Sequence, residues 1–169
     1  KAEGAKLTSS KKLIIKKLNE EERIKTTIVR PSKVMRTKVD QHVLDYGNYL
    51  HYCLELADIK NKDTSFIDDA KARQLVNNFL QIGLLKDASK GKIFKEDEFN
   101  DSTNHINGII DLMIVYDDHI DIIDYKTKNI DDEAYTLQLN TYRNYVEKAF
   151  TMNANIYLYS ILDGNLKQL

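Results

Sequence analysis

Cysteine and proline are almost missing from this chain of 169 residues, which has one of each, Cys53 and Pro31. A single cysteine excludes an internal disulfide, a four-cysteine zinc site and an iron–sulfur cluster held by four thiolates. No apolar run approaches the roughly 20 residues that a membrane-spanning helix needs, and no signal peptide is recognisable. These absences predict a cytoplasmic protein that holds no iron–sulfur cluster and has no membrane partner.

The composition is that of a folded domain, because 42% of the residues are hydrophobic, 30% are charged and only six are glycine. The net charge of -1 hides an uneven distribution. Residues 1–38 hold twelve Lys or Arg against four Glu, which leaves the remainder with a net charge of -9. We therefore expect a basic N-terminal arm or linker over residues 1–38 and one domain over residues 39–169. A domain of this acidity does not grip DNA over its whole surface.

Hydrophobic periodicity predicts seven elements within the domain. Apolar residues at helical spacing indicate helices within residues 40–59, 66–85 and 131–150. Runs rich in Ile, Val and Tyr indicate strands within residues 91–99, 105–116, 119–127 and 153–162. Because the central strands are apolar on both faces, we expect a sheet covered by helices on each side, which is an α/β fold.

One predicted strand, HIDIIDYKT, places charged residues where burial of charge is costly. A turn at Asp117-Asp118 joins it to the preceding strand as a hairpin. The pairs that follow from this turn are Val115 with Ile120, Met113 with Ile122, and Asp111 with Asp124. Alternation places Lys126 on the face of the two aspartates. Facing carboxylates destabilise a sheet unless a cation lies between them, and a divalent metal such as magnesium does this better than a lysine alone.

Two interpretations of this acidic pair are open at this point. In the first, Asp111 and Asp124 lie on a solvated strand face beside a neutralising lysine, since surface ion pairs are common. In the second, the apolar neighbours on the same face indicate that it is buried further along, so the charges line a pocket at its edge. A register error of one residue would remove this geometry.

Two predicted helices carry further candidate residues. His51 lies four residues after Gly47 and four before Glu55, so the three share one helix face. His51 is a candidate metal ligand, although most helical histidines are simply packed or exposed. Gln138 and Tyr142 are also four residues apart on one helix face, where an amphipathic pair at the edge of the core is the simplest interpretation.

Five segments follow one another in the chain: GNYLHYCLE, EDEF, GIIDL, DYKT and QLNTY. Together they resemble the PD-(D/E)XK nucleases, and within them the RecB-like nuclease domain of AddA-type helicase–nucleases. The resemblance covers about residues 42–160. The combination of GIIDL, DYKT and QLNTY is specific, whereas each motif alone is weak. The chain lacks the proline that the family usually has in the EDEF segment.

The resemblance implies a restriction-endonuclease-like core, with a central mixed sheet flanked by helices on both faces. It implies that His51, Asp111 and Asp124 bind a metal ion, Mg²⁺ or Mn²⁺, with help from the backbone carbonyl of Tyr125. It makes Lys126 the catalytic lysine, acting together with the two aspartates.

The same resemblance gives supporting roles to three further side chains. Gln138 and Tyr142 are expected to support the site or to contact the DNA backbone. Glu96 is expected to match the acidic residue of the family, with Glu98 as its rival.

The activity implied is metal-dependent hydrolysis of DNA, by the exonuclease domain of an AddA/RecB-type helicase–nuclease in double-strand break repair and recombination. The implied partners are DNA, a UvrD-like helicase motor in the same parent chain and an AddB-type subunit. No Walker A sequence occurs, so unwinding is not expected of this segment. The alternatives are a non-cutting DNA-binding or scaffold module of the same fold, and a stand-alone or CRISPR-associated nuclease.

Overall fold

A computed structural model describes residues 41–102, 106–131 and 133–169. The predicted basic arm over residues 1–38 lies outside these ranges and stays a prediction. By its internal contacts the chain divides into two units; of the described residues, 41–97, 110–131 and 133–169 belong to the first, and 98–102 and 106–109 belong to the second. All the candidate site residues except Glu98 belong to the first unit.

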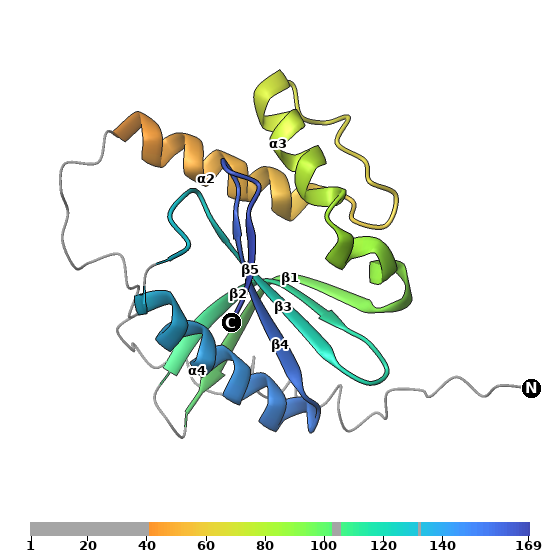
Figure 1. The fold of residues 1–169 in the computed structure, drawn as a ribbon, viewed down its shortest axis with the longest axis vertical. Helices are drawn as coiled ribbons and strands as arrows, with labels where there is room; N and C mark the ends of the chain where they lie inside the picture. The colour runs from red at the N-terminus through yellow and green to blue at the C-terminus, as the bar shows by residue number, and fades with distance from the viewer. Residues whose placement is uncertain (1–40, 103–105, 132) are drawn as a thin grey trace, which may run out of the picture. The chain divides into compact units, whose positions relative to one another are not determined.

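The described ranges contain three α-helices, one 3-10 helix and five strands (Figure 1). The helices are α2 (Gln41–Leu56), α3 (Ala70–Leu80), η2 (Gly83–Lys90) and α4 (Glu133–Phe150). The strands are β1 (Lys92–Asp101), β2 (Ile106–Val115), β3 (Ile120–Lys126), β4 (Ala154–Ser160) and β5 (Leu166–Gln168). Six of the seven predicted elements are confirmed, the predicted helix over residues 66–85 is replaced by α3 and the start of η2, and β5 is an additional strand. Within these ranges, no helix combines the length and the apolar character that crossing a membrane requires.

Helix α3 is shorter than the sequence pattern predicts. It begins at Ala70 because the carboxylate of Asp69 accepts a hydrogen bond from the backbone N–H of Ala72 at 2.6 Å, as an N-cap residue does. The helix ends at Leu80, and from Gly83 the chain continues as the 3-10 helix η2. The predicted single helix over residues 66–85 is therefore two elements, because a side-chain cap fixes its start and a change of winding follows its end.

The five strands form one mixed sheet in the order β1-β2-β3-β4-β5. β2 and β3 are antiparallel, β3 and β4 are parallel, and β4 and β5 are antiparallel. A parallel pair needs a long crossover, and α4 provides it between β3 and β4. The three residues of β5 are all exposed, so the strand has no alternating pattern by which the sequence would reveal it.

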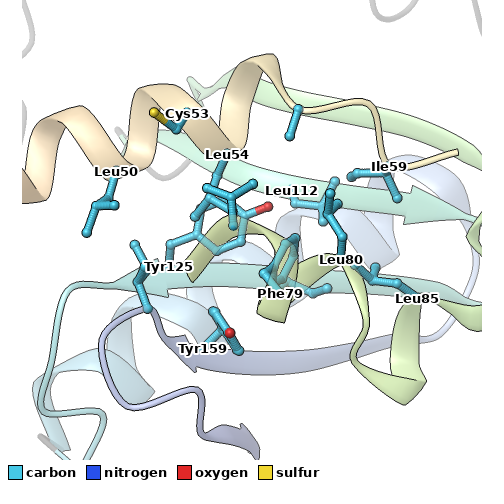
Figure 2. Packing of buried hydrophobic residues seen from close by; sticks show 14 of the residues in the cluster. Leu50, Cys53, Leu54, Ile59, Phe79, Leu80, Leu85, Leu112, Tyr125 and Tyr159 are labelled. Atoms are coloured by element: carbon cyan, nitrogen blue, oxygen red, sulfur yellow. The ribbon is translucent and has the colours of Figure 1, made fainter. Parts of the chain in front are cut away.

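Both faces of the sheet are covered, as the apolar central strands predict. The first six residues of β3 are all buried. On one face, side chains of β2, β3 and β4 join a core with α2, α3 and η2. Figure 2 shows part of this core, where the ring of Phe79 lies with its centroid 5.0 Å from that of Tyr125 and 4.9 Å from that of Tyr159. On the other face α4 lies against β4 (Figure 1). The side chains of Leu139 and Val146 of α4 are buried.

Lys95 connects β1 to the C-terminal end of α2. Its ammonium group donates a hydrogen bond to the backbone carbonyl of Glu55 at 2.8 Å and another to that of Ala57. The last carbonyls of a helix lack partners within the helix, and a cation near them is favourable. This contact holds α2, which carries His51, against the strand segment that carries Glu96.

Candidate metal and catalytic site

The hairpin of β2 and β3 has the predicted register. Val115 pairs with Ile120, and Met113 pairs with Ile122. Because successive strand residues point to opposite faces, this register also decides which face carries Asp111. On β2, Asp111 lies on the same face as Met113. On β3, the residues of that face are Ile122, which pairs with Met113, and Asp124, two residues further on.

The two aspartates lie at the end of this hairpin in a largely buried setting. Asp111 accepts a hydrogen bond through Oδ2 from the backbone N–H of Tyr125 at 2.6 Å, which ties the acid on β2 to β3. Asp124 is only 4% exposed, so the interpretation as a solvated strand face does not hold for it. Burial raises the pKa of Asp111 well above its ordinary value, and the negative charge of Asp124 raises it further. The pair therefore favours a bound cation or a proton.

Lys126 supplies part of the required positive charge. Its Nζ lies 2.5 Å from Oδ2 of Asp124, and both side chains are largely removed from solvent. Burial alone would lower the pKa of Lys126, but the carboxylates of Asp124 and Asp111 outweigh it, so its pKa lies above the ordinary value. The ammonium group is consequently charged at neutral pH. It lies beside the acidic pair.

Three residues from three different elements form a group with the donor atoms of a metal site. His51 of α2, Glu96 of β1 and Asp111 of β2 each offer one ligand atom, and these atoms all lie within 4.8 Å of one another. Burial lowers the pKa of His51 to about 4, and the charge of Lys126 contributes in the same direction. His51 is therefore neutral at pH 7, the form in which imidazole binds metals.

Glu96 reaches this group through an unusual backbone conformation. Its φ is +46°, in the left-handed region, although it lies inside a strand. A non-glycine residue held there costs about 1–3 kcal/mol and persists only where the surrounding structure enforces it. Such irregularities in a strand re-aim a side chain and are frequent beside active sites. Glu96 belongs to the group of three donor residues. Its rival Glu98 is exposed and does not belong to it.

The structure places the remaining candidate residues around this group. Gln138 and Tyr142 of α4 are joined by a hydrogen bond from Nε2 to the tyrosine hydroxyl at 2.6 Å. Burial raises the pKa of Tyr142, the hydrogen bond from Gln138 opposes this, and the charge of Asp124 adds to it, so the pair lies within electrostatic reach of the acids. The side chain of Tyr125 points to the opposite face, with its ring centroid 5.8 Å from that of His51.

Within the described ranges, Asp124 is not part of this group of three donor residues, and its Oδ2 is paired with Lys126. The family resemblance implies a ligand role for Asp124 and a supporting role for Glu96. In the structure a carboxylate oxygen of Glu96 lies within 4.8 Å of the donor atoms of His51 and Asp111, whereas Asp124 pairs with the lysine.

Two further residues lie near the site, and neither of them has a role predicted from the sequence. Thr127 lies against Gly47, so closely that a Cβ at Gly47 would be 2.7 Å from its Oγ1. The Nζ of Lys126 lies over the ring of Tyr135, 4.6 Å from the ring centroid. The one available hint for Tyr135 is its spacing, three residues ahead of Gln138 on the same helix.

The residues present fit a hard divalent cation. The donor set is one neutral imidazole and carboxylate oxygens, which suits magnesium or manganese better than a soft metal. Burial and the mutual repulsion of the carboxylates raise the pKa values of Glu96 and Asp111. A divalent ion bound between them would offset this repulsion. A cation site is therefore consistent with both the chemistry and the electrostatics of the group.

Comparison with known proteins also indicates metal-dependent hydrolysis of phosphodiester bonds. The model of the PD-(D/E)XK nuclease superfamily matches residues 18–166, which is most of the chain. No curated protein matches the chain significantly. The motif segments that carry His51, Glu96, Asp111, Asp124 and Lys126 all fall within the matched range. This protein belongs to the PD-(D/E)XK nuclease superfamily.

Proposed function

We propose that this chain hydrolyses phosphodiester bonds of DNA with a divalent metal ion, Mg²⁺ or Mn²⁺, bound by His51, Glu96 and Asp111, with Asp124 and the backbone carbonyl of Tyr125 completing the site. The observation that carries the proposal is the meeting of a neutral histidine and two carboxylates beside an ion-paired lysine. Family membership supports the reaction class.

In this proposal each residue has a distinct task. A bound divalent ion supplies a more acidic water and polarises the phosphate oxygens. The metal ligands are one nitrogen of His51 and one carboxylate oxygen each of Glu96 and Asp111, which lie within 4.8 Å of one another. Asp124 fixes the ammonium group of Lys126, and Lys126 orients the attacking water or stabilises negative charge on the phosphate. Gln138 and Tyr142, joined to each other, support the lysine side of the site or contact the DNA backbone.

A cleavage assay with end-labelled DNA tests this proposal. Lys126→Ala is expected to lower the turnover number about 100- to 1,000-fold, because removal of one group that stabilises developing charge has an effect of this size. Asp124→Ala is expected to reduce the affinity for Mg²⁺, so that half-maximal cleavage needs a higher Mg²⁺ concentration, and to reduce cleavage. Lys128→Ala, which removes an exposed lysine two residues further on, is the matched control and should cleave like the parent.

Folding of each variant is checked by its thermal unfolding curve. Lys126→Ala activity within a few-fold of the parent would contradict the role of the lysine. Cleavage that persists in the presence of a chelator would contradict the role of the metal. A parent protein that binds DNA but never cuts it under any divalent ion would support the alternative of a non-cutting binding or scaffold module.

We further propose that the chain is the exonuclease domain of an AddA/RecB-type helicase–nuclease acting in DNA repair and recombination. The support is the order of the GNYLHYCLE, DYKT and QLNTY motifs. In this proposal a helicase motor belongs to the same parent chain, and an AddB-type subunit is a possible partner. Digestion of a linear duplex and of the same duplex as a closed circle separates the outcomes, because an exonuclease degrades the first and spares the second.

A further inference from the structure

The ammonium group of Lys126 has two different neighbours. One is the carboxylate of Asp124, 2.5 Å from Nζ. The other is the aromatic ring of Tyr135, whose centroid is 4.6 Å from the same atom. Tyr135 comes from the first turn of α4, an element that reaches the site only because it forms the crossover between β3 and β4.

This second contact has a physical use. A lysine has a flexible stem and a point charge that forms no fixed geometry of its own. A single carboxylate draws Nζ to itself but leaves the ammonium free to swing around it. A ring on a second side attracts the cation through its negative face and restricts that motion, and the attraction is stronger where water is largely excluded. The side chain of Lys126 is 18% exposed, so this condition is met.

We propose that Tyr135 is a positioning residue that holds the ammonium group of Lys126 in its working place through the face of its ring. The inference rests on the proposed nuclease function and adds to it a residue of α4 that acts through the lysine. Asp124 alone fixes the distance of Nζ from the acidic pair, and the ring of Tyr135 fixes its direction. The hydroxyl group of Tyr135 has no part in this.

The kinetic test therefore separates the ring from the hydroxyl. Tyr135→Leu removes the ring but keeps an apolar side chain, and it is expected to lower kcat about 3- to 30-fold, with KM for DNA and the Mg²⁺ midpoint unchanged. Tyr135→Phe keeps the ring and is expected to recover the lost turnover. Tyr145→Leu removes another partly buried tyrosine of the same helix and is the matched control.

A second measurement does not depend on activity. In a protein labelled with ¹³C at lysine, the ε-methylene protons of Lys126 lie next to an aromatic face and should show an upfield ring-current shift. The peak is assigned by its loss in Lys126→Arg. The shift is expected in the parent and in Tyr135→Phe, and it should vanish in Tyr135→Leu.

The outcomes distinguish the inference from the function on which it rests. Unshifted lysine resonances in the parent, or a shift that survives Tyr135→Leu, would overturn the role of Tyr135 whatever the enzyme does. Equal loss of kcat in Tyr135→Phe and Tyr135→Leu would also overturn it, because the hydroxyl would then be the active part. A parent that fails to cut DNA while its lysine shows the ring-current pattern would refute the nuclease proposal and leave the contact established.

Discussion

At the scale of single residues, the site concentrates charge that the fold alone does not need. Asp111 is largely enclosed, faces the charge of Asp124, and accepts a hydrogen bond from the N–H of Tyr125. Such an arrangement stabilises little by itself, because burial and like charge both penalise the ionised acid. Stability and activity are therefore expected to oppose each other here.

Asp111→Asn is the first test of this conflict. The asparagine oxygen can still accept the Tyr125 hydrogen bond, while the buried negative charge is removed, so in the presence of a chelator we expect the variant to be about 0.5–2 kcal/mol more stable at neutral pH. Thermal unfolding measures the difference. The variant should also lose the stabilisation that Mg²⁺ gives the parent.

The sign of the pH dependence follows from the raised pKa of Asp111 in the folded state. The protonated acid is favoured on folding, so its contribution to stability is present below the ordinary pKa of about 4 and is lost as pH rises through the raised pKa. The advantage of Asp111→Asn should thus grow with pH. The exposed turn variant Asp117→Asn serves as the control, and a pH-independent difference would contradict this assignment.

Residue-level prediction from the sequence succeeded where the backbone is regular. Alternation along two paired strands was enough to place Asp111, Asp124 and Lys126 on one side of the sheet. Alternation alone could not place Glu96, which only the family resemblance named, because the left-handed φ of Glu96 breaks the alternating pattern. It could not anticipate Tyr135 either, since the contact with Lys126 depends on how a crossover helix docks.

At the scale of elements, α2 approaches the chain after β3 so closely that a glycine is required at the point of contact. Gly47 is buried in the middle of α2, and Thr127 directly follows the catalytic-lysine candidate Lys126. An added Cβ would come within 2.7 Å of Oγ1 of Thr127, whose β-branched side chain has little freedom to move away. A glycine in a helix is otherwise unfavourable compared with alanine by about 0.5–1 kcal/mol.

Gly47→Ala is consequently expected to destabilise the protein by about 1–3 kcal/mol, as overpacking does, despite its better helix propensity. In a Thr127→Ala background the obstacle is gone, and the same change should stabilise by up to about 1 kcal/mol. A double-mutant cycle from chemical denaturation measures both values. If Gly47→Ala has the same sign in both backgrounds, the contact is not what excludes alanine.

The elements themselves were largely predictable, and the exceptions have physical causes. Strong apolar periodicity located α2, α4 and the central strands. The exposed β5 offers no such pattern, since its place depends on hydrogen bonds to β4. The start of α3 depends on a cap at Asp69, which a hydrophobic pattern does not record.

At the scale of the whole molecule, metal binding and folding are linked through the same carboxylates. A divalent ion that binds the folded chain stabilises it by mass action. Protons compete for Asp111 and Glu96, whose pKa values are raised, first by burial and then by neighbouring negative charge. His51 does not compete above its lowered pKa of about 4.

The increase in melting temperature that Mg²⁺ produces should therefore shrink as pH falls from neutral toward the raised pKa values of the carboxylates, with the carboxylates and not His51 responsible. Melting curves with Mg²⁺ and with chelator at each pH measure the increment. Glu96→Gln should reduce the increment at every pH. An increment that follows the ordinary titration of histidine near pH 6.5 would contradict this division of roles.

The parallel pairing of β3 with β4 also has a kinetic meaning. The strands that bear Asp111 and Asp124 are joined by a tight turn, so they meet with little loss of chain entropy. β4 can join only after the long segment containing α4 has closed on itself, which is the slower kind of event. We therefore expect the hairpin that pairs the two aspartates to form before β4 joins the sheet, so the repulsion between these carboxylates arises before the sheet around them is complete.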